Sequence, residues 1–371
     1  MDLDFTPEQE LLRDTVRSVC QRHAGLDVVR AMEDDPVGYP DTFWKQLGEL
    51  GIPGMTIPEE FGGSGFSMVD AAIVYEEFGR ALSPSPHFVS CVLSAGVLTR
   101  AGTDAQRAEW LPRIASGEAI VTPAWLEPDG GYGPAGITAR AGHDGKTWSL
   151  TGVKQHVQFA GGADALLVLA RSDNAVVLAL VDPQANGVTL TQQTTIASDT
   201  QFRVELADVR VPEDAVIPGD GWETWEAVLH DGLILLAAYA AGGARYALEI
   251  TTEYAKTRHQ FDKPLGAFQA IAHYLADAVS AVDGAQTLVW EAAWAHSAGR
   301  PITRLAPMAK LFACQTFRDV TAMAQQVFGG VGFTLEYDIQ LYFRRAKQLQ
   351  LSWWDTRYLE ELVAADILDR T

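Results

Sequence analysis

The stretch from residue 258 to residue 269 reads Arg258-His-Gln-Phe-Asp-Lys-Pro-Leu-Gly-Ala-Phe-Gln269. It separates the first two of four segments in which apolar residues recur at the three-to-four-residue spacing of an amphipathic helix. These segments span residues 224–256, 268–299 and 304–327, and the last one begins at about Thr356. Four long amphipathic helices predict a four-helix bundle over residues 219–371.

The first third of the chain also shows helical spacing. Pro7 follows Thr6, and Glu8 and Glu10 lie in the first turn, where acidic side chains favour the positive end of a helix. Four further helical segments, separated by Gly/Pro breaks, cover residues 42–50, 67–82, 87–101 and 104–115. We therefore predict an all-α domain over residues 1–119.

The spacing changes between Ile120 and Pro218. Short apolar or alternating runs, such as 165–170 and 175–181, lie there between turn residues, as is typical of strands. We predict a small β-barrel or β-sandwich domain over residues 120–218. The expected fold class is therefore α+β, with the β domain between two helical domains.

The composition limits the kinds of partner. The chain has 371 residues and a formal net charge of -20, with no dense Lys/Arg cluster, so we expect no nucleic-acid partner. No uninterrupted apolar run reaches the ~18 residues of a membrane span, and the acidic N-terminus lacks the basic region of a secretory signal. Cys20, Cys91 and Cys314 are far apart and suggest neither a disulfide framework nor a metal site. We expect a cytoplasmic protein without a membrane partner.

Two motifs in the last domain carry groups that suit a dinucleotide. Arg258 can make two parallel hydrogen bonds to a pyrophosphate, and Gln269 follows 11 residues later, where an amide can reach the same ligand. Gly329-Gly330 allows a ligand to approach the backbone closely. Each motif alone also fits a structural role, as an arginine at a helix end or a turn between helices. Their joint presence favours a dinucleotide clamp.

The order of these segments resembles the acyl-CoA dehydrogenase family, and local matches occur in every third of the chain. The segment from Leu47 contains Ile57-Pro-Glu-Glu-Phe-Gly-Gly, which is similar to a turn of the family's N-terminal domain. The stretch that begins at Arg258 and the stretch Gln326-Val-Phe-Gly-Gly-Val-Gly-Phe333 are similar to its two most recognisable signatures. The resemblance covers nearly the whole chain.

The resemblance implies a flavoprotein that uses FAD to convert an acyl-CoA thioester to the 2-enoyl-CoA. It also implies an oligomer, because in the family these signatures reach FAD that is bound mainly on the neighbouring protomer. The residues of this chain that match them, and that we expect to contact FAD across the interface, are Arg258, Phe261, Gln269, Gln326, Gly329 and Gly330.

The family's chemistry needs a glutamate that removes the α-proton, and this chain lacks one at both usual positions. Aligning the Arg-x-Ala-Lys core of the C-terminal segment places Trp353 at the first position, and a count along the first bundle helix places Gly232 at the second. Neither side chain accepts a proton. Asp231 is the candidate replacement, although one helical step turns a side chain by ~100°. With His230, it also fits a polar patch near a helix start.

The chain's own flavin motifs depart from the family as well. Where the family has Thr-Glu-Pro-x-x-Gly-Ser-Asp, this chain has Leu126-Glu-Pro-Asp-Gly-Gly-Tyr-Gly133, so that Leu126 and Tyr132 replace hydroxyl residues. Where the family places a tryptophan against the flavin ring, this chain has His156, and Gln158 follows in place of a threonine. We expect Trp353 either to fill a vestigial pocket or to anchor the C-terminal helix.

This combination resembles the non-catalytic subunit of heteromeric α2β2 acyl-CoA dehydrogenases, a class associated with actinobacterial steroid degradation. In such an assembly, a paralogous partner supplies the glutamate and most of the flavin site. Two alternatives remain. One is a self-sufficient homo-oligomeric enzyme that uses Asp231, and the other is a flavin-free structural or regulatory protein on the same scaffold.

Overall fold

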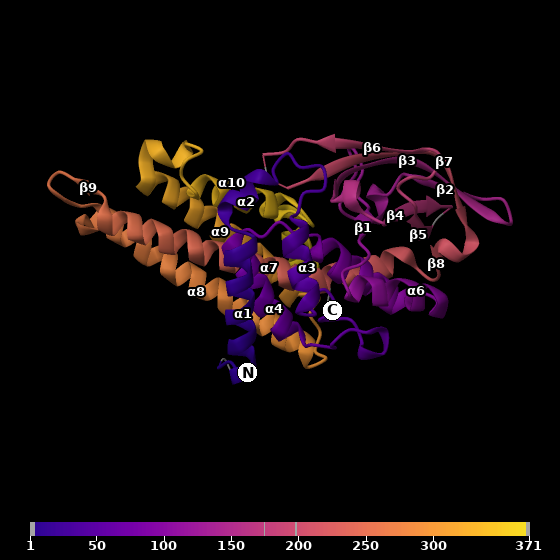
Figure 1. Ribbon diagram of the computed structural model, residues 1–371, viewed down its shortest axis with the longest axis horizontal. Coiled ribbons are helices and arrows are strands. Elements are labelled where there is room, and N and C mark those ends of the chain that lie inside the picture. Colours follow the sequence, from indigo (N-terminus) through magenta and orange to yellow (C-terminus); the bar gives the residue numbers. More distant parts are fainter. Residues whose placement is uncertain (1–3, 174, 197–198, 369–371) are drawn as a thin grey trace.

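The computed structural model describes residues 4–173, 175–196 and 199–368. It has helices at both ends of the sequence and a β-sheet in the middle, so the α+β class is confirmed (Figure 1). Thr6 caps the first helix as predicted, because its hydroxyl accepts a hydrogen bond from the Gln9 amide at 3.3 Å. The N-terminal helices are α1 (Pro7–His23), α2 (Leu26–Ala31), α3 (Asp41–Glu49), α4 (Met68–Ala81), the π-helix Phe88–Ser94, α5 (Ala95–Ala101) and α6 (Asp104–Ala115).

The middle strands form a single sheet, in which β6-β7-β3-β2-β4-β5-β8 are neighbours and β1 pairs with β4 in parallel. Strands β3 and β7 run antiparallel and are the two longest strands of the sheet. Their bounds are β1 (Val121–Ala124), β2 (Arg140–His143), β3 (Thr147–Gln158), β4 (Ala165–Ser172), β5 (Ala175–Val181), β6 (Val188–Gln193), β7 (Gln201–Pro212) and β8 (Val216–Ile217).

Strand β4 joins the sheet to the helices, because its alternate residues belong to two different cores. Leu167 and Leu169 pack into the large core that they share with the helices. Leu166 and Val168 point to the opposite face and pack into the smaller core of the β domain. The continuous apolar run of this segment is thus explained by burial on both faces of the sheet.

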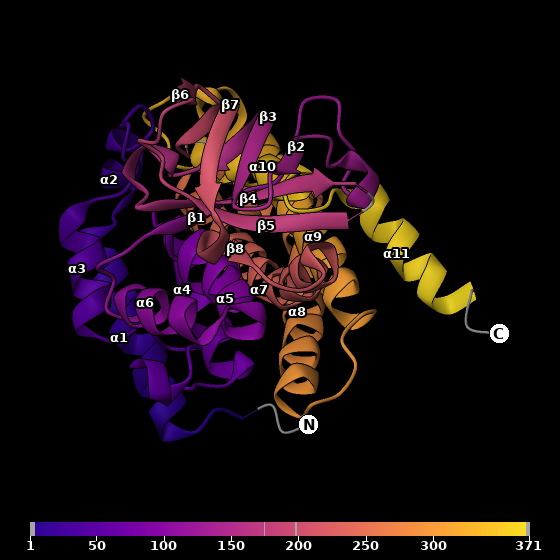
Figure 2. The ribbon, with the colours of Figure 1, turned by 90° about the vertical axis from the view of Figure 1, so that its right-hand side faces the viewer.

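The C-terminal part contains one more long helix than we predicted. Its helices are α7 (Gly221–Thr257), α8 (Gln269–Ser297), α9 (Leu305–Phe328), α10 (Ile339–Leu351) and α11 (Thr356–Leu368). Helix α10 was not expected as a helix, and it packs on α7 and α9. Helix α11 packs on α9 at its start and then extends away from the body of the protein (Figure 2).

Helix α7 is the central element of the fold and contacts α4, α8, α9 and α10. By length and composition alone it could cross a membrane, but 83% of its most apolar window is buried inside the protein. Its apolar surface is therefore covered by neighbouring helices. Between α7 and α8 a short hairpin of β9 (His259–Gln260) and β10 (Lys263–Pro264) projects at the end of the molecule opposite the sheet (Figure 1).

Candidate functional site

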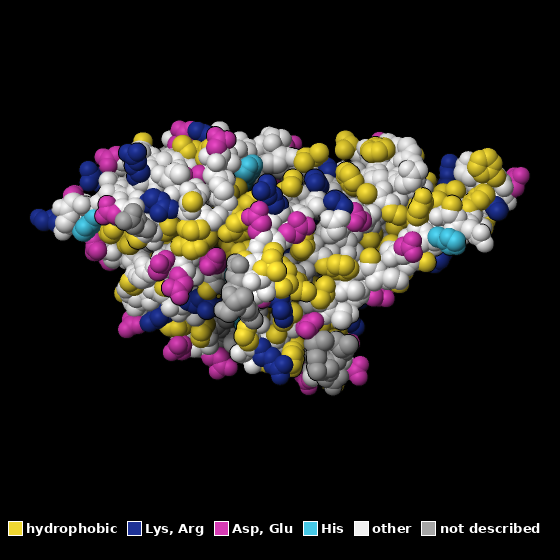
Figure 3. All heavy atoms as spheres, turned by 180° about the vertical axis from the view of Figure 1, so that it is seen from behind, with side chains coloured by type: hydrophobic (Ala, Val, Ile, Leu, Met, Phe, Trp, Pro, Cys, Tyr) yellow, Lys and Arg dark blue, Asp and Glu magenta, His cyan; other side chains and the backbone are white. Residues whose placement is uncertain are grey.

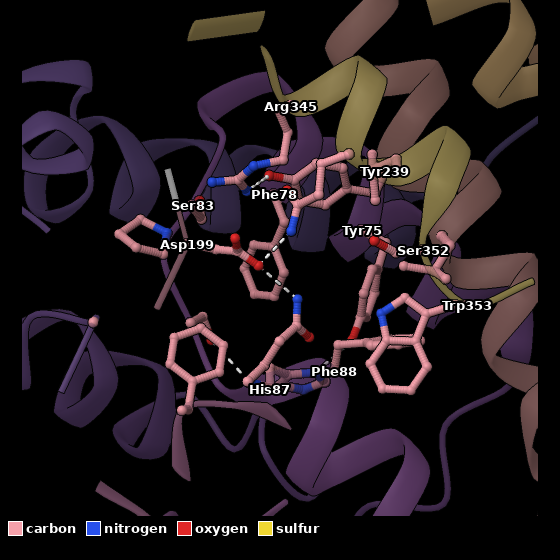
Figure 4. Close-up of a pocket in the computed structure, with 18 residues that line it drawn as sticks. Tyr75, Phe78, Ser83, His87, Phe88, Asp199, Tyr239, Arg345, Ser352 and Trp353 are labelled. Carbon is pink, nitrogen blue, oxygen red and sulfur yellow. Dashed lines mark hydrogen bonds between the residues drawn. The ribbon is translucent and has the colours of Figure 1, made fainter. Parts of the chain in front are cut away.

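A small cavity lies where α4, the π-helix, α7 and α10 meet strand β3. It encloses about 80 Å³ and is lined by the aromatic rings of Tyr75, Phe88, Tyr239 and Trp353, with the buried guanidinium of Arg345 at one end (Figure 4). Ligand pockets usually occupy roughly 300 Å³ or more. The cavity beside Trp353 is therefore smaller than a usual ligand pocket.

Trp353, at the first expected glutamate position, lies inside an aromatic cluster. Its indole stacks on Trp125, with ring centroids 6.1 Å apart and planes 13° apart, and the Phe88 ring meets it edge-on at 5.3 Å. The next residue, Trp354, is fully buried and packs against His230 and Tyr358. Trp353 thus fills the pocket and Trp354 anchors the start of α11, so the two expected roles fall to two adjacent residues.

The turn that carries both tryptophans is held by a buried lysine. Trp353 and Trp354 have φ values of 55° and 70°, a left-handed conformation that costs a bulky residue about 1–2 kcal/mol. The Lys310 ammonium of α9 donates hydrogen bonds to the carbonyls of Leu349 at 3.1 Å, Ser352 at 2.8 Å and Trp354 at 2.7 Å. Burial lowers the pKa of Lys310. These three bonds fix the backbone that places Trp353 in the cavity.

Gly232, at the second expected glutamate position, is packed against the π-helix. A Cβ atom at this position would lie 3.0 Å from the Cδ2 of Leu93 and 3.2 Å from the ring of Phe88. Even one added carbon requires these neighbours to move, and a glutamate side chain requires a larger rearrangement. The helix therefore offers no carboxylate at this point, and no space for one.

Asp231 does not line the cavity of Trp353 and instead faces a separate one on the other side of the π-helix. Its Oδ2 accepts a hydrogen bond from Arg100 at 2.5 Å, and its Oδ1 lies 3.2 Å from the Nε2 of His296. Burial raises the pKa of Asp231, but the hydrogen bond from His296 and the positive charge of Arg100 outweigh burial and leave the pKa below its usual value. Asp231 is thus held as a carboxylate among its own partners.

Asp199 lines the same cavity as Trp353. This carboxylate was not predicted from the sequence. Its oxygens accept hydrogen bonds from Gln158 at 2.7 Å, from Gln201 at 2.9 Å and from the amide of Gln348 (Figure 4). The amide oxygen of Gln201 in turn meets the Nδ1 of His156 at 2.8 Å. His156 and Gln158, predicted as departures from the flavin wall, thus belong to one polar network that ends on Asp199.

The chain's own groove for a flavin lies between the loop at residues 126–132, strand β3 and the end of α10. It encloses about 550 Å³ and is lined by Trp125, Leu126, His156 and Trp353. Lys347 is the one lysine or arginine among its described lining residues. The Tyr132 hydroxyl donates to the carbonyl of Leu351 at 2.8 Å, so this side chain joins the loop to α10. With a single lysine and no arginine, the groove does not fit a diphosphate.

The residues of the predicted clamp lie together at the far end of the bundle. The ring of Tyr254, one turn before Arg258, stacks on Phe328, the residue before Gly329-Gly330, with centroids 4.2 Å apart and planes 15° apart. Gln269 begins α8 at the same end. Side chains of the hydrophobic class gather here on the surface (Figure 3), and Phe261 at the tip of the hairpin is 87% exposed.

All six predicted contact residues, namely Arg258, Phe261, Gln269, Gln326, Gly329 and Gly330, are exposed. Within the part of the chain that the structure describes, no carboxylate pairs with the guanidinium of Arg258. The hairpin lies at the opposite end from the sheet, so these groups cannot reach the groove of their own chain (Figure 1). Their exposure leaves these groups accessible to a ligand from outside the chain.

Comparisons with known proteins agree with the motifs. The model of the acyl-CoA dehydrogenase N-terminal domain matches residues 6–118, and that of the acyl-CoA dehydrogenase C-terminal domain matches residues 219–352. A Bacillus subtilis protein named probable acyl-CoA dehydrogenase YngJ is 30% identical over 99% of this chain and 100% of its own length. The chain belongs to the acyl-CoA dehydrogenase family. FAD is the cofactor of this family.

Two solved structures share the fold of this acyl-CoA dehydrogenase. A chain of the ChsE4-ChsE5 complex from Mycobacterium tuberculosis is 27% identical, with a TM-score of 0.91 and full coverage of both chains. A chain of a variant of the Tcur3481-Tcur3483 steroid ACAD is 30% identical, with a TM-score of 0.87 and 98% coverage of both chains. The first is named as a complex, and the name of the second joins two designations, Tcur3481 and Tcur3483.

Sequence reasoning missed the buried charges of this acyl-CoA dehydrogenase that shape the site. Lys310 lies on the apolar face of a predicted helix, and a lone lysine there was the available signal. Lys154 and Glu127 form a buried ion pair at 2.5 Å, and the amides of Thr138 and Ala139 also donate to Glu127. Burial raises the pKa of Glu127, but the charge of Lys154 and the hydrogen bonds to Glu127 outweigh burial and leave this pKa below its usual value. This pair fixes the loop that begins at Leu126.

Proposed function

We propose that this chain is the subunit without a catalytic glutamate in a heteromeric acyl-CoA dehydrogenase. It completes the FAD site of a paralogous subunit across the interface. The observation that carries the proposal is the contrast between its two ends. Trp353 fills the glutamate position inside a cavity of about 80 Å³, whereas Arg258 and its neighbours are exposed at the far end of the bundle.

The clamp residues have separate roles in this proposal. Arg258 binds the pyrophosphate of FAD with two N–H groups, and the amides of Gln269 and Gln326 bind nearby polar groups of the same molecule. Gly329-Gly330 leaves the backbone open to close approach, since a Cβ at either position would meet no atom within 4 Å. Phe261 supplies an apolar surface to the partner. FAD, when bound, accepts the hydride that leaves the β-carbon of the substrate.

The paralogous partner supplies the glutamate and most of the flavin pocket. Support comes from two solved structures of this fold, the ChsE4-ChsE5 complex and the Tcur3481-Tcur3483 steroid ACAD, each named with a pair of designations. We assign the complete enzyme to steroid-derived acyl-CoA thioesters, supported by the likeness to a structure that is named a steroid ACAD.

The self-sufficient enzyme that uses Asp231 has less support. A general base must lie within hydrogen-bond reach of the proton it removes. Asp231 lines a different cavity from Trp353 and is engaged by Arg100 and His296. Its lowered pKa also makes it a weak proton acceptor at neutral pH.

Expression of the chain alone and together with a paralogous acyl-CoA dehydrogenase from the same genome tests the proposal. Each purified sample is assayed for bound FAD by its visible absorbance, and for oxidation of acyl-CoA with an artificial electron acceptor. We expect FAD and turnover only in the co-expressed complex. Full FAD occupancy and turnover by the chain alone would exclude the proposal. A stable complex with the paralogue that contains no FAD would favour the flavin-free scaffold instead.

A further inference from the structure

A second cavity lies behind the π-helix and is not used by the proposed function. It encloses about 340 Å³, within the range of small-molecule pockets, whereas the cavity beside Trp353 is much smaller. The two cavities share no lining residue among those described. This second cavity is therefore a separate compartment of the protein.

The walls of the second cavity are apolar, and small residues keep it open. Val92, Gly96 and Thr99 follow one another at intervals of four and three residues, which places them on one face of the helical segment 88–101. These three residues are half-buried, so this face is partly exposed, and Val228 of α7 lies beside Gly96, where a Cβ would meet it at 3.0 Å. The remaining apolar lining comes from Ala95 of the same segment and from Ile57, Phe66, Met68 and Leu235 of other elements.

The polar groups of the cavity come from three helices. Arg100 lies in the last turn of α5, Asp231 belongs to α7, and His296 lies near the end of α8. Asp231 bonds to both of the others, through Oδ2 to Arg100 at 2.5 Å and through Oδ1 to His296 at 3.2 Å. The Asp231 side chain is 18% exposed and that of Arg100 is 45% exposed, so the arginine is the more accessible of the two.

The arginine still has hydrogen-bonding capacity in this arrangement. A guanidinium has five N–H donors, and among the described residues Asp231 is the only partner of the Arg100 side chain. An apolar cavity with a partly free guanidinium at its rim matches a molecule with a short hydrocarbon body and a terminal carboxylate. The body fills the face of Val92, Gly96 and Thr99, and the carboxylate accepts the remaining N–H groups of Arg100.

We propose that this cavity is a binding site for small aliphatic monocarboxylates, in which Arg100 binds the carboxylate and Asp231 competes with it for the guanidinium. Because of this competition, substitutions of Arg100 and of Asp231 should change the affinity for the carboxylate in opposite directions. Loss of Arg100 removes the ligand's charged partner. Loss of the charge of Asp231 frees the guanidinium and removes a like charge from the site. A merely structural cluster would show no such opposition.

Octanoate is the probe, with octanol and octylammonium as ligands of the same length that lack the negative charge. Binding to the purified full-length protein, alone or in its complex, is measured by calorimetry at neutral pH. We expect saturable binding of octanoate at concentrations below about 1 mM, at least tenfold weaker binding of octanol, and no binding of octylammonium. Equal binding of octanoate and octanol, or no saturation, overturns the proposal.

Four variants complete the test, with folding checked by circular dichroism. Arg100→Gln should weaken octanoate binding by about tenfold or more, and Asp231→Asn should strengthen it several-fold. Thr99→Phe should block binding by filling the cavity while leaving the charged groups in place. Arg107→Gln removes an arginine of α6 that pairs with Asp104 outside the cavity, and should change nothing. Unchanged octanoate binding in folded Arg100→Gln or Thr99→Phe contradicts the proposal, and so does weaker binding in Asp231→Asn.

Discussion

The indole of Trp353 stacks on the indole of Trp125, which begins the loop of the chain's own flavin groove. The two rings come from segments more than 200 residues apart in the sequence. The stack therefore joins the end of α10 to the β domain. The family resemblance predicts the glutamate position at Trp353, so a contact that stabilises the fold occupies that predicted position.

Replacement of Trp353 by alanine should destabilise the protein strongly. The variant loses the stack on Trp125 and the edge contact with Phe88, and it leaves a large space in a buried cluster. We expect the free energy of unfolding to fall by about 3–5 kcal/mol. Urea denaturation measures the change. Trp110→Ala is the control, because this half-buried indole packs mainly under Arg113 and its loss should cost clearly less. Equal losses for the two variants would contradict the role of the stack.

A glutamate introduced at either usual position should not create an active single subunit. In Gly232→Glu the new side chain collides with Leu93 and Phe88, and we expect a loss of about 1–3 kcal/mol in stability from overpacking. In Trp353→Glu the charge enters a buried aromatic cluster, where Phe88 and Trp125 pack against the position. Acyl-CoA oxidation by each isolated variant, followed at saturating FAD, is the measurement. Turnover above that of the unmodified chain would show that the pocket is intact apart from the missing base.

Lys310→Met should loosen the turn that carries Trp353 and Trp354. Methionine matches the length of the lysine stem but donates nothing to the three buried carbonyls of Leu349, Ser352 and Trp354. We expect a loss of at least about 2 kcal/mol, since unsatisfied buried acceptors are costly. Thermal unfolding and the intrinsic tryptophan emission report the change. Lys347→Met is the matched control, because this exposed lysine bonds only to the side chain of Gln350 among the described residues.

Glu76 should make the stability of the protein depend on pH. Burial raises the pKa of Glu76 to about 7, against the hydrogen bond from Gln286 that lowers it. The folded state therefore keeps a proton that the unfolded state releases near pH 4.5. The free energy of unfolding should accordingly fall as the pH rises from about 5 to 7.

Glu76→Gln keeps the acceptor for Gln286 and removes the titration, so its stability should vary less over this range and should exceed that of the unmodified protein at pH 8. Urea denaturation at pH 5, 6, 7 and 8 provides the comparison. Glu109→Gln, at an exposed position of α6, serves as the control. A slope that persists unchanged in Glu76→Gln would assign the pH dependence to another group.

Arg258→Ala should lower the FAD content of the heteromeric complex without preventing its assembly. The guanidinium is exposed in the isolated chain, so its loss should hardly change the stability of this subunit. Arg258→Lys keeps the charge but loses the paired donors, and should give an intermediate FAD content. Arg210→Ala on the surface of β7 is the control, since this side chain pairs only with nearby surface carboxylates in the described chain. Full FAD content in Arg258→Ala would remove Arg258 from the clamp.

The sequence predicted the elements whose apolar residues are periodic and missed those whose buried faces are polar. Helix α10 keeps helical spacing in Ile339, Tyr342, Ala346 and Leu349, but it also buries Gln340, Arg345 and Gln350, and it was not predicted. The helical span 87–101 was predicted, but its first half is π-helical, a geometry that depends on packing against α7. The direction of Asp231 could not be read from the sequence, because it depends on where Arg100 and His296 lie in space. Long-range partners of this kind appear only in the folded chain.

The alternation along β4 makes the sheet and the helices inseparable in evolution as well as in folding. Leu167 and Leu169 pack into the core that is shared with the helices, and Leu166 and Val168 pack into the core of the β domain. If the β domain were exchanged for that of a relative, every second side chain of the new β4 would be adapted to pack on the helices of that relative. Recombination within this family should therefore succeed only when breakpoints keep β4 with the helices that cover it. Chimeras cut at the apparent domain borders should melt in one transition at a lowered temperature, because the two cores share a single backbone.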